Sequence, residues 1–297
     1  MDGMKRVHLI DASLYVFRAW HSMPDQFADH EGHPVNAVYG FCQFLLDFVE
    51  QARPSHAVAA FDESLTTSFR NEIYPAYKAN REPAPSSLLR QFAYCRELAR
   101  AMGFTVLSDT RFEADDLIGS AAAALREHGF FASIISADKD FGQLIGDGDE
   151  QWDFSRGQRG NASGVRARLG VTPAQVADFL ALAGDSIDNI PGVPGIGAKT
   201  ATVLLSHFGD LDSLLSRVDE IPFLRLRGAA SIARKLREHA EDARLARRLT
   251  AIALDAPVPR MPEEFALRAP DHDALADLLD RLDFGRGTRE RLSRLGA

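Results

Sequence analysis

The sequence predicts an α/β fold in which a parallel β-sheet is followed by a helical part. Three short apolar runs each end in an aspartate, and helical patterns lie between such runs. Strands that alternate with helices favour βαβ units, and hence a parallel sheet covered on both faces. After about residue 165 every periodic segment is helical. We therefore assign residues 1–165 to the α/β part and residues 166–297 to the helical part.

The expected strands are short and buried. Their apolar runs cover residues 7–11, 57–62, 104–107, 131–138 and 151–154. Asp11 and Asp62 close the first two runs, and Asp138 closes the fourth. In parallel α/β sheets, ligands bind beyond the carboxyl ends of the strands. We therefore expect these three aspartates at one functional edge.

The expected helices fall into two groups. In the α/β part, apolar spacing indicates helices at about 35–51, 87–102 and 114–128, the last ending at the stop signal His128-Gly129. In the helical part, it indicates helices at about 173–183, 198–207, 211–217, 229–248 and 273–283. The glycine- and arginine-rich stretch 155–165 has neither period, and we interpret it as a polar loop at the boundary.

The composition is ordinary for a soluble globular protein. Hydrophobic residues make up 45% and charged residues 26%, and no apolar run is long enough to span a membrane. Asp11 interrupts the first apolar run too early for a signal peptide. Cys42 and Cys95 lie in apolar helical patterns, which is typical of reduced core thiols. We expect a cytoplasmic protein of bacterial type, with a monomer as the default.

Acidic residues gather in a way that helix caps do not explain. Beyond the strand ends they form a triplet, Glu113, Asp115 and Asp116, and two close pairs, Asp138 with Asp140 and Asp185 with Asp188. Each acid alone is more often a cap or a turn residue, but caps need only one acid per helix. So many like charges repel one another unless cations lie among them. The sequence therefore predicts a metal site.

The type of metal follows from the donors. All candidate ligands are oxygens, and no histidine or cysteine clusters with them in the sequence, so Mg²⁺ is favoured over Zn²⁺, with Mn²⁺ as a substitute. The number of carboxylates suits two ions, the arrangement used for in-line displacement at phosphate. The net charge of −8 does not exclude a nucleic-acid partner, because removing these nine carboxylates from the 42 acids leaves 33 against 34 basic residues.

Two stretches carry signals for a phosphate backbone. Residues 184–201 join the last acid pair to a glycine- and proline-rich turn and then to Lys199-Thr200 at a helix start, where backbone N–H groups bind phosphate. Residues 68–85 are basic, aromatic and edged by prolines, and they interrupt the alternation of strands and helices. We expect them as a surface excursion above the carboxyl edge of the sheet.

In this order the motifs resemble those of the 5′-nuclease family of flap endonucleases and 5′→3′ exonucleases, in particular the 5′-nuclease domain of bacterial DNA polymerase I, here as a stand-alone chain. The matching segments are Ile10–Ser13, Phe61-Asp62, Phe69–Arg81, Glu113–Asp116, Asp138–Asp140 and Gly184–Ala201. The resemblance implies a PIN-like nuclease core with a helical arch or clamp at about 63–90. It also implies a helix-hairpin-helix-type (H3TH) motif at about 184–207.

The resemblance implies a role for each matched acid. The first metal cluster would comprise Asp11, Asp62, Glu113, Asp115, Asp116 and Asp138. Asp140, Asp185 and Asp188 would bind or support the second ion. All nine acids are present, so the sequence shows no loss of the metal site.

The resemblance also implies the residues that act on DNA. Lys78 and Arg81 match a basic pair over the scissile phosphate, and Lys78 would neutralise charge on the transferring group. Arg70 and Tyr77 lie in the same motif and are expected to contact DNA. Tyr77 either stacks on a base or anchors its segment to the core, and the sequence leaves both open.

The hairpin is expected to hold duplex DNA without reading its sequence. Its expected contacts are Gly192, Gly195, Gly197, Lys199 and Thr200. Some members of the family also place K⁺ in this hairpin, so the resemblance admits that ion here. The prolines at 83 and 85 leave little sequence for a long ordered helix in the arch.

The sequence thus predicts a Mg²⁺-dependent 5′-nuclease that cleaves DNA at or near 5′ ends, flaps and single-strand/duplex junctions in replication or repair. A DNA polymerase in trans is a candidate partner. A phosphatase of the haloacid dehalogenase type is disfavoured, because it needs a second aspartate two residues after the first and Asp11 is followed by Ala12-Ser13. A non-catalytic DNA-structure binder would have lost metal ligands. An RNA-cleaving nuclease of similar fold stays open.

Overall fold

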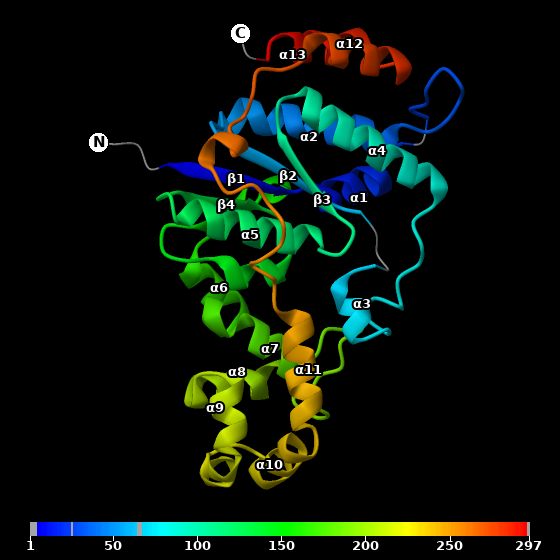
Figure 1. Ribbon diagram of the computed structural model, residues 1–297. Helices are drawn as coiled ribbons and strands as arrows, with labels where there is room; N and C mark the ends of the chain where they lie inside the picture. Colours follow the sequence, from blue (N-terminus) through cyan, green and yellow to red (C-terminus); the bar gives the residue numbers. More distant parts are fainter. Residues whose placement is uncertain (1–4, 25, 64–66, 296–297) are drawn as a thin grey trace.

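The computed structural model describes residues 5–24, 26–63 and 67–295. Figure 1 shows an α/β part built on one sheet and a helical part extending away from it. The predicted fold class is therefore confirmed. Among the helices of the described residues, none combines the length and the apolar character needed to cross a membrane.

One six-stranded sheet organises the α/β part. Its strands are β1 (Arg6–Asp11), β2 (Ala57–Asp62), β3 (Thr105–Asp109), β4 (Phe131–Ile135), β5 (Glu150–Asp153) and β6 (Gln158–Gly160). They lie in the order β3-β2-β1-β4-β5-β6, with β1 to β5 parallel and β6 antiparallel to β5. Because β1, β2 and β4 are neighbours, the residues that follow their carboxyl ends meet at the centre of one edge.

Alternate residues of each strand serve two different hydrophobic layers. Val58 and Ala60 of β2 pack on the side of α5 (Ala114–Arg126). Ala59 and Phe61 pack on the opposite side, together with α1 (Ala12–Ser22), α2 (Asn36–Ala52) and α4 (Ser86–Ala101). A period of two in the strands, with apolar residues at every position, is what burial on both faces requires.

The helical part shares its core with the α5 side of the sheet. Its helices are α6 (Ala162–Leu169), α7 (Val176–Ala183), α8 (Ala198–Phe208), α9 (Leu211–Ser216), α10 (Ala229–Glu238) and α11 (Ala240–Thr250). Buried side chains run without a break from Leu117 of α5 through Phe141 to Leu180 of α7 and Leu204 of α8. The two parts are therefore joined by continuous packing.

The last two helices depart from the expected two-part division. Helices α12 (His272–Arg281) and α13 (Arg286–Ser293) lie against α4 and α2 of the α/β part, at the end of the molecule opposite the helical part (Figure 1). The chain returns there because the Arg268 amide donates to the Gly103 carbonyl at 3.0 Å. A Cβ on Gly103, whose φ is +93°, would lie 2.1 Å from the Arg268 carbonyl oxygen, so the close approach requires glycine.

Other elements differ from the sequence-based expectation for local reasons. The stretch 155–165 is not only a loop, since it contains β6 and the start of α6. Strand β6 is largely exposed, so it carries no apolar alternation to recognise. The expected helix 229–248 is two helices that meet at His239, and α1, α3 (Phe69–Ile73) and α13 were not expected as separate helices.

A buried histidine in β1 predicts a pH dependence of stability. Burial and the neighbouring Arg6 lower the pKa of His8 to about 4, with Glu150 and Arg159 also nearby. A histidine held neutral in the fold stabilises it above the unfolded pKa of about 6.5, and this contribution is lost as the pH falls toward 4. We expect protonation at His8 to lower the unfolding free energy by about 2 kcal/mol when the pH falls from 7.5 to 5. Urea unfolding of the wild type and of His8→Leu at both values measures it, and equal losses in both proteins would contradict the assignment.

Candidate active site

The carboxyl edge of the sheet is held together by the acids that close its strands. Asp11 caps α1, with its Oδ1 accepting from the Leu14 amide at 3.3 Å, and its Oδ2 accepts from the Ser136 hydroxyl at 2.8 Å. Asp62 accepts from the Ala114 amide at 2.9 Å. The cap role does not exclude the predicted ligand role, because both carboxylates also line one cavity.

Seven of the nine predicted acids line a single cavity of about 220 Å³ at this edge. They are Asp11, Asp62, Glu113, Asp115, Asp138, Asp140 and Asp188. Lys78 and Arg81 are the basic side chains that line it. The structure thus brings together acids from four strand ends and loops that lie up to 177 positions apart in the sequence.

Mutual repulsion and burial perturb these carboxyl groups. Burial, with Asp62 nearby, raises the pKa of Asp11 to about 7. Burial and the adjacent Asp138 raise the pKa of Asp140 to about 7, and burial also raises the pKa of Asp62 and Asp115. The Oδ1 of Asp140 is buried without a hydrogen-bond partner among the described residues. Cations bound among these carboxylates would offset their mutual repulsion and favour their charged forms, so the cluster is suited to cation binding.

The donor set fits divalent cations in its chemistry. It offers only oxygen ligands, in excess over the two basic side chains of the cavity, and the unpaired Asp140 oxygen lies among them. Within residues 5–24, 26–63 and 67–295, however, no three acidic, histidine or cysteine side chains are arranged around one point as ligands of a single ion. Lys78 and Arg81 form ion pairs with carboxylate oxygens of Glu113 and Asp188, which such ions would need as ligands.

The basic side chains are positioned by a strained turn. Lys78 has a φ of +55°, a region that costs free energy for a residue with a side chain. Its Nζ donates to Glu113 Oε2 at 2.7 Å, and Arg81 pairs with Asp188 Oδ1 at 2.5 Å. The turn therefore directs the side chains of Lys78 and Arg81 toward the acidic cavity.

This turn is docked on the loop that carries Asp188. The Lys78 amide donates to the Asp188 carbonyl at 3.0 Å. The Asn80 side-chain Nδ2 donates to the Ser186 carbonyl at 2.9 Å, and the Asn189 side-chain Nδ2 donates to the Ala76 carbonyl at 2.6 Å. Sequence reasoning missed both asparagines, although an Asn in each of two matched motifs was the available signal. We call this contact the turn–loop junction.

The expected helical arch is shorter in the structure. Between residues 67 and 85 the chain forms only α3 and successive turns, and α4 begins at Ser86. Residues 64–66 lie outside the described residues. Pro83 and Pro85 account for the extended chain before α4, because proline disfavours helix in the residue before it.

Arg70 and Asp116 do not have the positions that their predicted roles need. Arg70 was expected to contact DNA, but it is 1% exposed. Its guanidinium forms two bonds to the Asp116 carboxylate, at 2.7 and 2.8 Å, and donates to the Leu249 and Ala251 carbonyls. Asp116 is fully buried and lies outside the acidic cavity. The Arg70–Asp116 pair ties α5 to the end of α11. The expected DNA contact of Arg70 and the expected ligand role of Asp116 therefore do not fit these positions.

Two further predicted residues serve neighbouring groups. Tyr77 is 3% exposed, and its hydroxyl donates to Glu113 and Asp188, so it anchors its segment and cannot stack on DNA. Asp185 lies beside the cavity and not in its lining. It pairs with Lys139 at 2.7 Å and accepts from the Ile187 amide.

The glycine-rich hairpin divides into a packed half and an open half. A Cβ on Gly192 would lie 2.4 Å from the Gly184 amide nitrogen, so its predicted DNA contact is better explained as close packing between two backbones. Gly195 and Gly197 are exposed, and Gly197 precedes α8, whose first turn carries Lys199 and Thr200. Lys235 of α10, which sequence reasoning missed, lies over Gly195.

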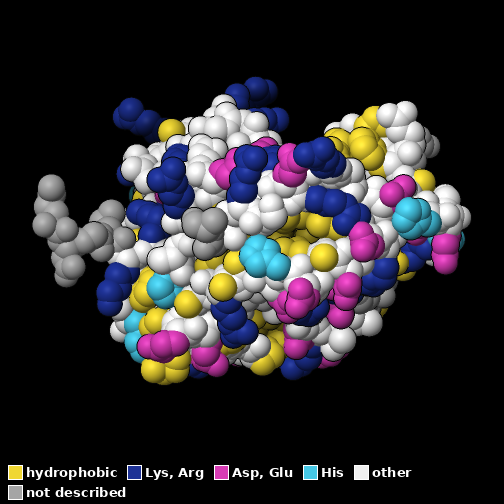
Figure 2. Space-filling view, turned by 90° about the horizontal axis from the view of Figure 1, so that it is seen from above, with side chains coloured by type: hydrophobic (Ala, Val, Ile, Leu, Met, Phe, Trp, Pro, Cys, Tyr) yellow, Lys and Arg dark blue, Asp and Glu magenta, His cyan; other side chains and the backbone are white. Residues whose placement is uncertain are grey.

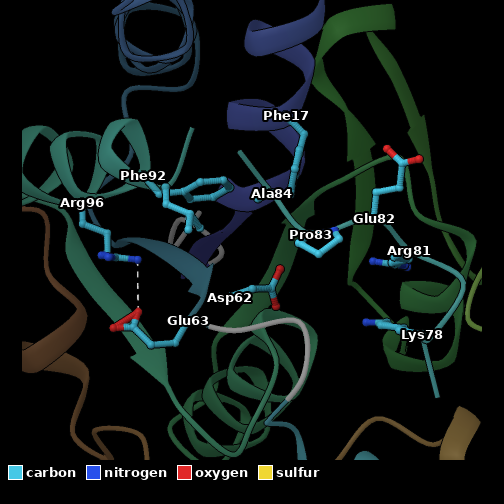
Figure 3. Close-up of a pocket in the computed structure, with 11 residues that line it drawn as sticks. Phe17, Asp62, Glu63, Lys78, Arg81, Glu82, Pro83, Ala84, Phe92 and Arg96 are labelled. Atoms are coloured by element: carbon cyan, nitrogen blue, oxygen red, sulfur yellow. Dashed lines mark ion pairs between the residues drawn. The ribbon is translucent and has the colours of Figure 1, made fainter. Parts of the chain in front are cut away.

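A second cavity of about 510 Å³ adjoins the acidic one and shares Asp62, Lys78 and Arg81 with it. Figure 3 shows these three residues facing an apolar wall that includes Phe17 and Phe92. The wall comes from α1 and α4. The second cavity therefore offers both cationic and aromatic surfaces beside the acids.

Carboxylates cluster beneath the basic side chains of Lys78 and Arg81 at the edge of a parallel sheet. This arrangement is typical of α/β enzymes that hydrolyse phosphate diesters. The family model of the 5′-3′ exonuclease N-terminal resolvase-like domain matches residues 6–170, and that of the 5′-3′ exonuclease C-terminal SAM fold matches residues 171–273. The chain belongs to the 5′-3′ exonuclease family. The predicted family and nuclease class are confirmed, and the phosphatase alternative is not favoured.

Curated relatives agree with this assignment. The chain is 35% identical over 288 residues to DNA polymerase I of Rhizobium leguminosarum, covering 95% of this chain and 28% of the relative. It is 37% identical over 284 residues to DNA polymerase I of Bacillus caldotenax, covering 94% of this chain and 32% of the relative. The chain spans about a third of the length of these relatives.

Solved structures share the fold. T5 5′-exonuclease with bound divalent metal ions (zinc) superposes with a TM-score of 0.69 at 19% identity, covering 99% of this chain and all of that one. The catalytic core of Rad2 in complex with DNA substrate gives a TM-score of 0.65 at 15% identity, covering 98% of this chain and 92% of that one. At these identities the likeness concerns the fold.

Proposed function

We propose that the acidic cavity is the catalytic centre of a Mg²⁺-dependent, structure-specific 5′-nuclease that hydrolyses DNA at or near 5′ ends, flaps and single-strand/duplex junctions. The observation that carries this proposal is the gathering of seven carboxylates around one cavity, faced by Lys78 and Arg81. Family membership supports the reaction class. The metal-bound T5 exonuclease and the DNA-bound Rad2 core support the metal and the substrate by analogy of fold.

The residues divide the work of hydrolysis. The seven lining acids would hold two Mg²⁺ ions, which supply charge neutralisation and activation of water. Lys78 and Arg81 bind the non-bridging oxygens of the phosphate and stabilise the charge that grows there. The attacking water gives up a proton as its oxygen bonds to phosphorus, the bond from phosphorus to the 3′ oxygen breaks, and the leaving 3′ oxygen takes up a proton. The products are a 5′-phosphate and a 3′-hydroxyl.

The hairpin would hold the duplex at a set distance from the cut. Gly195 and Gly197 would let a DNA strand approach the backbone N–H groups at the start of α8, with Lys199 and Thr200 as further contacts. The K⁺ that the resemblance admits would bind in the same hairpin. The turn–loop junction bonds the cationic turn directly to the loop before this hairpin. Specificity therefore follows the shape of the substrate and not its base sequence.

The second cavity supports a preference for unpaired ends. Phe17, which is partly exposed, lines this space of about 510 Å³ beside Lys78 and Arg81. An aromatic side chain can stack on a base of any identity. The relatives named DNA polymerase I support work in DNA replication or repair, and they motivate the proposals of a DNA polymerase as partner and of a cytoplasmic location.

Cleavage assays on defined junctions test the proposed function. With 5′-flap, 5′-overhang and nicked duplexes, we expect cleavage in Mg²⁺, none in excess EDTA, and ligatable 5′-phosphate ends. Asp140→Asn removes a charge from the cavity and is expected to lower turnover at least about 100-fold. The control, Asp277→Asn, changes an exposed acid of α12 and should cut like the wild type. Cleavage that survives EDTA, or tight binding without any cleavage, would sink the proposal.

A further inference from the structure

We propose that a pocket under the β5–β6 hairpin is a second binding site for the phosphate backbone of DNA, distinct from the acidic cavity and from the glycine-rich hairpin. The inference rests on the proposed function, since it names a further part of the substrate path. The pocket has a volume of about 290 Å³. Its lining includes Arg156, Arg159 and Arg168, from the hairpin and from α6.

The arginines of this pocket are incompletely neutralised. Among the described residues, Arg168 forms no ion pair, and its bond is to the neutral Oε1 of Gln151 at 3.1 Å. Arg156 is 72% exposed in its side chain and reaches only Asp153, at 3.8 Å. Arg159 has a close acid partner, Glu150, at 2.7 Å. The lining thus carries three guanidinium groups and a single carboxylate, that of Asp153.

One arginine of the pocket, Arg159, is held in place before any ligand arrives. The Arg159 guanidinium lies 3.7 Å from the ring centre of Trp152, which is itself 1% exposed, so stacking fixes its plane. Gly157, with a φ of +64°, makes the tight turn that presents this strand. A side chain that is already ordered loses little entropy on binding, which favours affinity.

The lining residue Gln151 is bonded to the turn at residues 136–140, which carries Asp138 and Asp140 and is called here the acidic turn. Gln151 is buried, and its Nε2 donates to the carbonyls of Ser136, at 3.1 Å, and of Asp138. The Ser136 hydroxyl in turn donates to Asp11. A phosphate held by Arg168 is therefore separated from the cutting site by a short chain of hydrogen bonds, so its offset from the cut is set by the fold.

The chemistry of the lining favours a phosphate ester on a long polymer. Guanidinium groups match phosphate oxygens in pairs, and the three heads are exposed at an open rim. An extended strand can lie across such a rim, and DNA is the polymer that the adjacent cavity is proposed to cut. Either the cut strand or its complement could supply the phosphate, so the experiment separates the two.

Binding measurements with a charge-matched control test the site. The test variant carries Arg156→Gln, Arg159→Gln and Arg168→Gln, and the control carries Arg281→Gln, Arg286→Gln and Arg294→Gln. The control arginines are exposed and belong to the end of the molecule opposite the helical part. Figure 2 shows that end with acidic and basic side chains interspersed. Both variants change the net charge equally, so a general charge effect cancels.

Affinity for a nicked 5′-flap duplex is measured by fluorescence anisotropy in EDTA, where the proposed enzyme does not cut, over a range of KCl concentrations. We expect the test variant to bind about tenfold more weakly at 0.15 M salt, with a shallower salt slope by roughly 0.9 for each lost phosphate contact. The control variant should bind nearly as the wild type does. Equal affinities and slopes in both variants would overturn the site, whereas a wild type that cuts no junction would overturn the proposed function instead.

Two additions keep the result interpretable. If the triple variant fails to fold by circular dichroism, Arg168→Gln alone serves, because Arg168 forms no ion pair among the described residues; it should weaken binding about threefold and lower the slope by roughly 0.9. Neutral methylphosphonate linkages, moved along the cut strand or along its complement, identify the phosphate. A neutral linkage at the bound phosphate should weaken binding by the wild type and leave binding by the triple variant unchanged. If no position on either strand behaves in this way, the proposal is contradicted.

Discussion

Replacing Arg70 by methionine is expected to lower the unfolding free energy by about 3–5 kcal/mol, because it leaves the buried Asp116 charge without its partner. The guanidinium also satisfies two backbone carbonyls, of Leu249 and Ala251, that would lose a donor. Urea unfolding measures the loss. The Glu72–Arg111 pair is exposed on both sides, so Arg111→Met is the matched control and should cost less than about 1 kcal/mol.

A double variant shows whether the cost comes from the buried charge. Asp116 Oδ2 now accepts from the Glu113 amide and Oδ1 from the Ala253 amide, and the single side-chain oxygen of Asp116→Asn keeps one of these two bonds. Arg70→Met with Asp116→Asn should therefore recover part of the stability lost in Arg70→Met. If Arg70→Met instead keeps full stability and loses DNA affinity, the original expectation of a DNA contact is right and the structural assignment fails.

Replacing Lys78 by methionine is expected to lower turnover about 100- to 1,000-fold while changing DNA affinity little, because its charge is needed where the phosphate becomes more negative. Methionine keeps much of the stem, so packing against Tyr77 is largely retained. Single-turnover cleavage of a 5′-flap duplex and anisotropy binding separate the two effects.

Lys199→Met provides the contrast for Lys78. Lys199 is exposed in the first turn of α8 and is absent from the lining of the acidic cavity. Its loss should weaken binding and leave single-turnover cleavage at saturating protein nearly unchanged. An unchanged rate in Lys78→Met would remove Lys78 from the reaction. A thermal melt of each variant excludes unfolding as the cause.

The buried position of some motif residues was not readable from the sequence. Arg70 and Tyr77 stand in the same basic, aromatic segment as Lys78 and Arg81, and all four look alike as candidates for DNA contact. Which of them face solvent depends on how α3 and the following turns pack on α5 and α11. Those contacts join residues up to 181 positions apart, and no local pattern encodes them.

The second phosphate pocket was hidden for a different reason. Arg156 and Arg159 lie in the stretch 155–165, which we interpreted as a boundary loop because an exposed edge strand has no apolar period, and Arg168 follows that stretch in α6. The pairing of β6 with β5 folds this stretch back beside the acidic turn. Its proximity to Ser136 and Asp138 then follows from strand order, with β5 next to β4.

By itself the sequence determined the class of fold, the family and the acids of the cavity. Strand-end aspartates and acid pairs are local patterns, and a parallel sheet brings strand ends together whatever the rest of the chain does. Only the tertiary structure decided that Asp116 neutralises a buried arginine, that Asp185 pairs with Lys139, and that Tyr77 is an anchor. Those outcomes depend on burial and on partners from distant segments, and the free energy of a charged group is set by both.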